Sequence, residues 1–497
     1  MMLSLGKQPI FAAVFGNKGV THFWEARFLP KCLPVLLGIS LGIFTAFLIV
    51  NEPWPIPIAV ALMVPAAILF VRYPFAAVII WMLVLPFFAR GTSVADRYVY
   101  WMIHRAMIPL ALGVVILSDW LGIRKRKPVR WGPAELAMLI FMGLALVNIL
   151  LFSQSYQNPI YKVFDRIFVP FCMYWLITLT APREKDVKLF LWAAFVTVVA
   201  QSIIGLLAWF APQVLPPYWL GLAGQRTVGT LRNVAVYTST LIFLSLLLFQ
   251  YTMHCRSRWL RSMLLFTFGL ALFCVFFSFS RGSWLGCSLV VVGLMVPYAK
   301  AVVRLTIALA ILVYILSGSI LADHVAWGWE RLTGDASVRS AESRVITNNA
   351  SLRMIEAQPL WGWGYGDYDL YDRQFQTRVG NIAVTHDGTS HNTFLSIMAE
   401  MGLPAFFFYM FPVGWWLVLS IKTRRRLPRD GFWSWRLLMV LWLAVAHIFI
   451  VSNFMDMVRN HPFGTTLCWM ALGLVANTVY PYLKPGDVTG PESGPPA

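Results

Sequence analysis

The sequence predicts an all-α, polytopic integral membrane protein, and three observations support this fold class. Of the 497 residues, 59% are apolar and only 12% are charged, whereas a soluble domain has about 25% charged residues. About fourteen apolar runs are long enough to cross a bilayer as helices of roughly 17 to 25 residues. Runs of this length lack the alternating pattern of barrel strands, and backbone in lipid must then be helical. The composition therefore excludes a soluble globular protein.

The predicted spans follow one another along most of the chain. They cover residues 32–50, 55–71, 74–89, 99–118, 133–152, 163–180, 187–210, 234–252, 261–279, 283–299, 301–322, 393–420, 433–453 and 463–481. Prolines interrupt the second and third runs, which are either two spans or one re-entrant pair, and the run around Arg281 is either continuous or a broken helix. We therefore expect about 12–14 transmembrane helices.

These runs divide the chain into five parts. A cytoplasmic N-terminus (1–31) precedes an N-terminal transmembrane bundle (32–322), a mainly helical periplasmic loop domain (323–390), C-terminal transmembrane helices (391–484) and a disordered, Pro/Gly-rich tail (485–497). The N-terminus shows no small-residue cleavage site after a short apolar core, so no removable signal peptide is expected. In the loop domain, residues 341–357 predict a surface helix that ends before Pro359 and three closely spaced glycines.

The distribution of the net charge, 40 − 22 = +18, indicates the orientation. Cytoplasmic loops carry an excess of Lys and Arg, and an alternating topology puts the basic clusters at 124–127, 183–188, 256–261, 300–304 and 422–429 in the cytoplasm. It leaves on the other side Arg90, Arg97, Arg166, Arg226, Arg232, Arg281 and the arginines of the loop domain. These arginines indicate an anionic lipid or substrate as partner rather than nucleic acid.

Cysteines, histidines and acids show no metal or disulfide signature. The six cysteines lie in or beside apolar runs, with no C-x-x-C pair. The pair Asp367-x-Asp369 could bind a metal that holds a sugar nucleotide, but in an acid-rich loop beside Asp372 such a pair arises easily by chance. His386 and His461 have no ligand spacing. We therefore predict no metal site and no cofactor.

The first candidate motif is S-F-S-R-G-S at residues 278–283. A guanidinium near the hydrocarbon is costly unless it is paired, which makes Arg281 a functional candidate; the alternative is an interfacial arginine that snorkels. Gly282 permits a close backbone approach, and Ser280 and Ser283 add donors at the same depth. Together these residues predict an oxyanion-binding site.

The second motif is the external loop at 224–233, which contains Arg226 and Arg232 among small residues. Such a loop can fold over a phosphate, because each guanidinium offers two parallel donors and keeps its charge. The alternative is that either arginine is merely solvated.

The third motif, at 390–404, begins where the loop domain re-enters the membrane. His391 stands at this boundary, where an imidazole can act as a general base near neutral pH. The alternative is that Ser390 or Asn392 caps the helix and His391 only packs. Glu400 lies nine residues on, on the opposite helix face and deeper, so the expected orienting acid is Asp387 or one from elsewhere in the chain.

Other polar side chains fall within predicted spans. We expect them to form interhelical pairs or to line a cavity. They are His104, Arg105, Asp165 with Arg166, and His447.

The order of these motifs resembles the O-antigen ligase and polymerase superfamily of bacterial inner-membrane proteins. The resemblance covers roughly residues 226–404 and rests on S-R-G, an outer helix that begins near Arg344, P-L-W-G-W-G-Y-G-D-Y at 359–368, and S-H-N-T-F-L through E-M-G-L-P at 390–404. The N-terminal spans match only in hydropathy.

The resemblance implies a glycosyltransferase that is independent of metals and cofactors and works at the periplasmic face of the inner membrane. Its donor would be an O-antigen glycan on undecaprenyl pyrophosphate, and its acceptor a sugar hydroxyl of the lipid A-core oligosaccharide. Carried onto this chain, it makes Arg281 and His391 catalytic, and Arg226, Arg232 and Arg281 ligands of the pyrophosphate. Asn392, Ser280 and Arg344 would support them.

Several alternatives remain at this point. O-antigen polymerases and protein O-oligosaccharyltransferases belong to the same superfamily, although only two predicted spans and a short tail follow the H-N motif here, which disfavours the latter. A secondary transporter would also carry intramembrane Arg and His, but near the bilayer midplane rather than at span ends. A membrane scaffold would not explain the external arginines.

Overall fold

The computed structural model describes most of the chain between Pro55 and Leu483. The described residues are 55–88, 94–123, 132–154, 157–180, 182, 184–217, 219–220, 226–231, 233–317, 322–377, 390–457 and 461–483. The chain divides into two units, Met1–Leu69 and Phe70–Ala497, and helix α4 (Pro55–Arg72) begins in the first. The predicted N-terminal segment 1–31, the span at 32–50 and the tail at 485–497 lie outside the described residues.

Every regular element of the described ranges is a helix. The helices of the second unit are α5 (Ala76–Phe88), α6 (Val94–Tyr100), α7 (Met107–Trp120), α8 (Pro133–Phe152), α9 (Gln157–Val163), α10 (Val169–Thr180), α11 (Glu184–Phe210), α12 (Val234–Thr252), α13 (Arg258–Phe276), α14 (Arg281–Ser317), α15 (Ala322–Thr333), α16 (Asp335–Ala357), α17 (Tyr368–Phe375), α18 (Thr393–Thr423), α19 (Trp435–Ser452) and α21 (Pro462–Val479). Two π-helical segments, η2 (Trp101–Ala106) and η3 (Phe164–Phe168), continue into α7 and α10, and η4 (Pro212–Val214), η5 (Gly229–Leu231) and η6 (Tyr480–Tyr482) are short 3₁₀ turns.

Ten of the described helical segments are long and apolar enough to cross a membrane, the first at Asp96–Trp120 and the last at Pro462–Tyr482. With no strand among the described residues, this confirms the prediction of an all-α, polytopic membrane protein. α5 is apolar but shorter, because Pro74 precedes it and Pro86 interrupts its last turn.

The apolar run predicted at 283–299 and residues 301–317 of the run predicted at 301–322 lie in one helix, α14. Its backbone breaks at Tyr298, directly after Pro297, where φ is −140° and ψ is 31°. Before the break Gly286 and Gly293 pack against α19, and after it Leu305 contacts Gly269 of α13. The break therefore separates two segments that pack on different neighbours, as expected for two runs.

α12 and α21 form the centre of the bundle, since 89% of the apolar window of each is buried. α12 packs against α11, α13 and α19, and α21 packs against α10. Glycines allow these close approaches, as small residues do between membrane helices: Gly473 of α21 lies against Ile177 of α10, and Gly205 of α11 lies against the Tyr237 side chain of α12.

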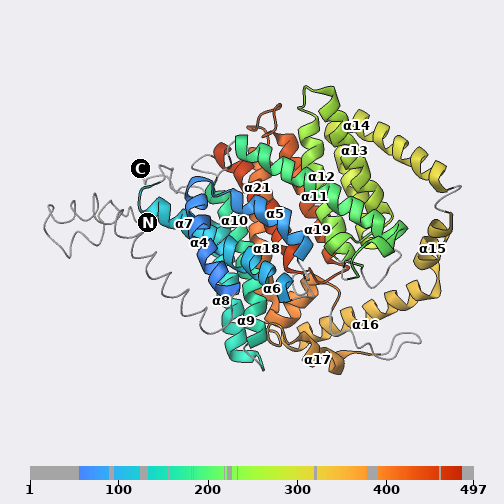
Figure 1. The fold of residues 1–497 in the computed structure, drawn as a ribbon. Helices are drawn as coiled ribbons and strands as arrows, with labels where there is room; N and C mark the ends of the chain where they lie inside the picture. The colour runs from blue at the N-terminus through green and yellow to red at the C-terminus, as the bar shows by residue number, and fades with distance from the viewer. Residues whose placement is uncertain are drawn as a thin grey trace, which may run out of the picture. The chain divides into compact units, whose positions relative to one another are not determined.

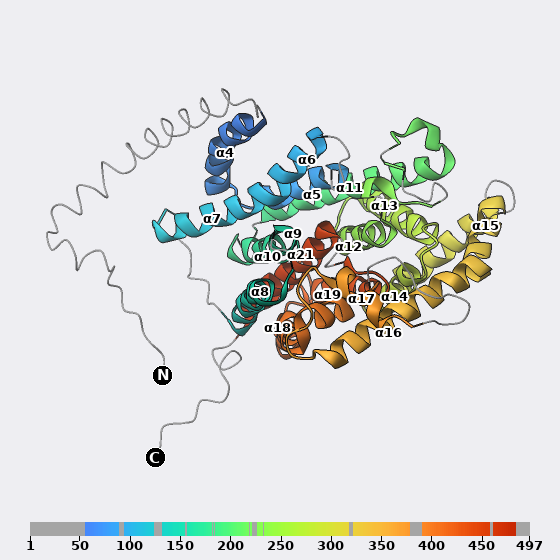
Figure 2. The ribbon, with the colours of Figure 1, turned by 90° about the horizontal axis from the view of Figure 1, so that it is seen from below.

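The loop domain is helical, as predicted, and lies at one end of this bundle (Figure 1). α16 begins at Asp335, six residues before the predicted surface helix at 341–357, and packs against α17 and α18. α15 contacts both α14 and α16, and Figure 2 shows α16 next to α17. We call the end of the bundle with α16 and α17 the loop end, and the end with the connection between α18 and α19 the opposite end.

Candidate functional site

The turn between α13 and α14 holds Arg281 through a strained residue. Phe279 has a left-handed φ of 47°, which is unfavourable for a bulky side chain and persists only where packing determines it. Its buried ring packs in a cluster with Trp209 and Phe277, and Gly328 of α15 approaches the same ring. The turn is therefore fixed both by the bundle and by the loop domain.

Ser280 caps α14 directly before Arg281. Its hydroxyl oxygen accepts hydrogen bonds from the N–H of Ser283 (3.4 Å) and from the Ser283 hydroxyl (3.0 Å). Ser283 is fully buried, with its Oγ 2.7 Å from Oγ1 of Thr238 in α12. Ser280, expected from the sequence as a donor to an anion, is thus an acceptor in the helix cap. Arg281 is the first residue of α14, where unpaired N–H groups and the helix dipole add positive potential.

Arg226 lies beside the same turn. The N–H of Thr227 donates to the Phe277 carbonyl (3.5 Å), and the Thr227 hydroxyl donates to the Cys274 carbonyl (2.6 Å). The Nε of Arg226 is buried and has no hydrogen-bond partner within the described ranges, and a buried donor without a partner is costly. This arrangement suits an anionic ligand. Arg232, the other predicted loop arginine, lies outside the described residues.

α16 brings Arg344 to the S-R-G turn. Burial and the charge of Arg281 both lower the pKa of the Arg344 guanidinium, so the positive charge of Arg281 acts on Arg344. Three residues further along α16, Oγ1 of Thr347 lies 3.5 Å from the carbonyl oxygen of Ser390, the neighbour of His391. Arg344 therefore stands between the S-R-G turn and the S-H-N turn.

His391 occupies a second strained position. Its φ is 53°, and hydrogen bonds order the backbone on both sides of it. The hydroxyl of buried Ser390 donates to the Asn392 carbonyl (2.7 Å) and accepts from the Asn392 N–H (3.1 Å). The Asn392 side chain caps α18 by accepting from the N–H groups of Phe394 (2.9 Å) and Leu395 (3.2 Å). Asn392 is thus the predicted helix cap, while His391 remains half-exposed.

The turn between α19 and α21 joins the two motifs. Nδ2 of Asn392 donates to Oδ1 of Asn453 (3.4 Å). The ring of Phe454 lies against Gly282, where an added Cβ would come within 2.8 Å of it. One short turn therefore contacts both the residue after Arg281 and the residue after His391.

The same turn contains Asp456, which the motif analysis does not single out. This carboxylate is 1% exposed, and it accepts a hydrogen bond from the Ser396 hydroxyl, which in turn lies within hydrogen-bonding distance of the Ser390 hydroxyl. Asp387, the acid expected near His391, lies outside the described residues. Asp456 is therefore a buried acid that the structure places beside the S-H-N turn through Ser396. A sequence signal existed, because an isolated acid follows a predicted span end on the same side as His391.

The Gly- and Trp-rich segment 359–368 pairs with a break in α18. Leu403 N–H donates to the Pro359 carbonyl (2.8 Å), and Gly364 N–H donates to the Glu400 carbonyl (3.0 Å). The Glu400 carboxylate accepts from the N–H of Tyr368 (3.2 Å). α18 breaks at Gly402, whose φ of 83° and ψ of 172° lie in a region that essentially only glycine occupies. Glu400 thus helps to hold the loop against the helix that carries His391.

Replacing Gly402 by alanine should destabilise this pairing. The Cβ of alanine would lie 2.2 Å from the Leu360 carbonyl oxygen, and the backbone strain alone costs about 1–3 kcal/mol. We expect a lower thermal unfolding midpoint and faster proteolysis of the loop domain. Gly414→Ala in the same helix is the matched control, because its Cβ meets nothing within 4 Å. Equal midpoints for the two variants would contradict the pairing.

Asp367 of the D-x-D pair has a packing role. Its Oδ2 accepts hydrogen bonds from the Ser153 hydroxyl (2.8 Å) and from the Gln154 N–H (2.8 Å), which join the loop domain to the end of α8. Across the described part of the chain, no group of three or more His, Cys, Asp or Glu side chains could hold a metal ion. His386 lies outside that part.

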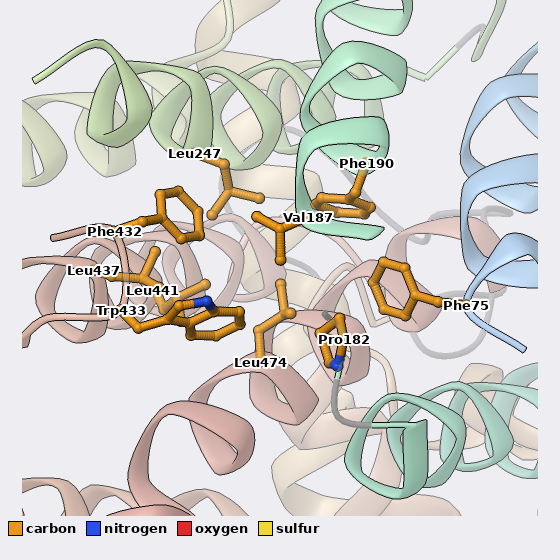
Figure 3. Close-up of a pocket in the computed structure, with 10 residues that line it drawn as sticks. All are labelled: Phe75, Pro182, Val187, Phe190, Leu247, Phe432, Trp433, Leu437, Leu441 and Leu474. Carbon is orange, nitrogen blue, oxygen red and sulfur yellow. The ribbon is translucent and has the colours of Figure 1, made fainter. Parts of the chain in front are cut away.

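An apolar recess of about 320 Å³ lies at the opposite end of the bundle (Figure 3). It is lined by Phe75, Pro182, Val187, Phe190, Leu247, Phe432, Trp433, Leu437, Leu441 and Leu474. With no charged or hydroxyl side chain in its lining, this recess offers nothing to a reacting polar group.

Arg226, Arg281, Arg344 and His391 lie on segments that these contacts link, and we call this candidate grouping the arginine–histidine site. Four separate segments contribute to it: the turn before η5, the start of α14, α16 and the start of α18. Guanidinium groups bind phosphate oxygens through pairs of parallel hydrogen bonds, and an imidazole can accept a proton. The site therefore combines the groups needed to hold a diphosphate and to deprotonate a hydroxyl.

Arg344→Gln should separate stability from function. At neutral pH the Arg344 charge opposes folding, since a cation whose pKa is lower in the folded protein is less favourable there than in the unfolded chain. We therefore expect an unchanged or higher unfolding midpoint. The affinity for an anionic ligand should fall by about tenfold or more. Arg339→Gln, an exposed position of the same helix, is the control. A large loss of stability in Arg344→Gln would contradict the repulsion.

Comparison with known proteins adds one match. Residues 266–410 match the protein-family model described as O-antigen ligase, a range that includes Arg281, Arg344 and His391, while Arg226 precedes it. No curated protein matches the chain.

Proposed function

The chain belongs to the O-antigen ligase and polymerase superfamily, and we propose that it is the ligase that completes lipopolysaccharide. In this proposal it transfers O-antigen glycan from undecaprenyl pyrophosphate to a sugar hydroxyl of the lipid A-core oligosaccharide. The protein crosses the bacterial inner membrane many times, with the arginine–histidine site facing the periplasm. The basic clusters of the opposite end would then lie in the cytoplasm, in accordance with the positive-inside rule.

One observation carries this proposal: the turn after α19 contacts both Gly282 and Asn392, the residues that follow Arg281 and His391. The charge of Arg281 also lowers the pKa of the Arg344 guanidinium, and two like charges of this kind favour an anionic ligand. A diphosphate would offset these charges and accept hydrogen bonds from the guanidinium groups. A glycosyl diphosphate is therefore a substrate that suits both the charge and the donors of the site.

We assign the donor diphosphate to Arg281, Arg226 and Arg344, with Arg232 as an additional ligand. Pyrophosphate is already a good leaving group, so neutralising its developing charge can replace protonation by a general acid. The first-turn N–H groups of α14 would add to this stabilisation. The arginines supply positive charge that a divalent cation supplies in other diphosphate sites, so we expect transfer to continue in excess chelator.

His391 then acts as the general base. An imidazole nitrogen takes the proton of the acceptor hydroxyl while the hydroxyl oxygen bonds to the anomeric carbon. The bond from that carbon to the diphosphate oxygen breaks, and its electron pair leaves with undecaprenyl pyrophosphate. A single displacement inverts the anomeric configuration, and cleavage of the diphosphate linkage provides the driving force without ATP.

A reconstituted reaction tests the proposal. The purified protein in lipid vesicles receives undecaprenyl-pyrophosphate-linked O-antigen and lipid A-core, with and without EDTA, and the products are separated by size and by attachment to core. Core-linked glycan in both conditions is the expected result. Lengthening of the lipid-linked glycan would instead identify a polymerase, transfer to a protein acceptor an O-oligosaccharyltransferase, and movement of unreacted donor across the vesicle a transporter.

A further inference from the structure

Two π-helical segments face each other outside the arginine–histidine site. η2 interrupts the helix formed by α6 and α7, η3 interrupts the helix formed by α9 and α10, and the two segments are in contact. π-helical turns are rare and occur frequently at functional sites. η2 carries His104 and Arg105, and η3 carries Asp165 and Arg166. Both segments precede the range that matches the family model.

One carboxylate in this cluster is fully occupied. Nε and Nη2 of Arg105 donate to the two carboxylate oxygens of Asp165, each at 2.6 Å. The buried His104 lies 3.1 Å from the Asp165 carbonyl oxygen and accepts from the indole N–H of Trp81 (3.2 Å). The prediction of an interhelical polar pair is thus correct for Arg105 and Asp165.

Within the described residues, Arg166 has no such partner. Its Nε and Nη1 are buried, and neither makes a hydrogen bond to any residue that the structure describes. The cluster therefore holds two guanidinium groups for one carboxylate, whose two oxygens are already engaged by Arg105. An uncompensated guanidinium within a membrane span is costly and marks a functional site by default. An anion from outside the chain would satisfy both the charge and the free donors.

The cluster lies at the loop end of the bundle. Lys162, one helical turn before Arg166, donates from Nζ to the Gly366 carbonyl (2.7 Å) in the segment that pairs with α18. Arg105 stacks on Tyr161 (5.2 Å from the ring centroid), and the Tyr161 side chain is itself exposed. Exposed aromatic rings of this kind typically sit at the membrane–water interface. The cluster is therefore reachable from the membrane on the same side as His391.

We propose that Arg166, supported by Arg105, binds a phosphate or carboxylate group of a membrane-embedded glycolipid. This inference rests on the proposed function, in which the donor diphosphate occupies the arginine–histidine site and the acceptor is the second anionic glycolipid at this end of the bundle. Its anionic group would anchor on η3 while its sugar hydroxyl reaches His391, so donor and acceptor occupy separate arginine sites. The headgroup of an anionic phospholipid offers the same chemistry, and the experiment distinguishes the two sources.

The test measures binding and does not depend on catalysis. The full-length protein in detergent is titrated with phosphorylated lipid A-core, with the same glycolipid after phosphatase treatment, and with phosphatidylglycerol, and the complexes are counted by native mass spectrometry. Arg166→Gln should bind the phosphorylated glycolipid about tenfold or more weakly, as expected for the loss of a charge-assisted contact. It should bind the dephosphorylated form like the wild type.

Two variants control for fold and for general charge. Arg166→Lys keeps the charge and should recover part of the affinity, and Arg97→Gln removes an exposed arginine from the nearby α6 and should leave binding within about twofold. Arg105 is unsuitable as a test position, because its removal would leave the Asp165 carboxylate without the hydrogen bonds that Arg105 donates.

The outcomes separate this inference from the proposed function. Equal binding of all three probes by folded Arg166→Gln and by the wild type would overturn the anion site. If Arg166→Gln lost only the binding of phosphatidylglycerol, an anion site would remain, but its assignment to the acceptor would be overturned. The ligase proposal alone would be overturned by two results together: the wild type does not ligate glycan, and Arg166→Gln still weakens binding of the phosphorylated glycolipid.

Discussion

His391→Asn should lower the rate of glycan transfer by about 10²–10⁴-fold, the usual contribution of a general base. Asparagine is the informative replacement because it tolerates the left-handed backbone of this position better than most residues. The cap formed by Asn392 and the hydrogen bonds of Ser390 do not involve the imidazole, so the protein should stay folded. The initial rate at saturating donor and acceptor is the measurement.

Donor binding should remain nearly unchanged in this variant, because in our proposal the arginines hold the diphosphate. His254→Asn is a suitable control, since His254 lies at the opposite end of the bundle in contact with the Gln250 carbonyl (2.9 Å). More than about a tenth of the wild-type rate in His391→Asn would be incompatible with general-base catalysis by this residue.

Arg281→Gln should reduce transfer by about 10²–10³-fold, as the loss of one preorganised charge-stabilising donor does elsewhere. Arg281 is exposed at the first residue of α14, so glutamine should fold normally. Unlike His391→Asn, this variant should also bind the lipid-linked donor more weakly. Arg281→Lys keeps the charge without the paired donors, so its transfer rate and donor affinity should lie between those of the wild type and Arg281→Gln.

Arg256→Gln controls for net charge, because Arg256 is exposed in the connection between α12 and α13 at the opposite end. Wild-type donor affinity in Arg281→Gln would remove Arg281 from the diphosphate site. Together, His391→Asn and Arg281→Gln separate the effect of proton transfer from the effect of donor binding.

Much of the fold could be predicted because its cause is local. Long apolar runs must form helices in lipid, and the described helices follow the predicted runs closely, for example α8 at Pro133–Phe152 and α12 at Val234–Thr252. Helix ends within the loop domain were less predictable, since α16 extends six residues before the predicted start. Neither apolar content nor periodicity marks the first turns of a polar helix.

Sequence patterns single out the residues of the candidate site one by one, but they do not indicate how these residues are connected. Arg281, Arg226 and His391 stand out because charged or titratable side chains are costly at span ends. Ser280 is predicted as a supporting donor, and the structure adds a second role, because its oxygen accepts hydrogen bonds in the cap of α14. Asp456 was missed because one acid between two spans has no motif around it, and its contact with Ser396 crosses 60 residues.

By itself, the sequence determined that this protein is an all-α membrane protein with arginines and a histidine at span ends, because bilayer thickness and the cost of buried charge act on each segment separately. Only the tertiary structure decided which of these residues meet. The charge of Arg281 acts on Arg344 because α16 packs back onto the bundle. Nε and Nη1 of Arg166 find no hydrogen-bond partner among the described residues, whereas Arg105 binds both oxygens of Asp165. Such pairings depend on contacts between distant segments, which no local pattern encodes.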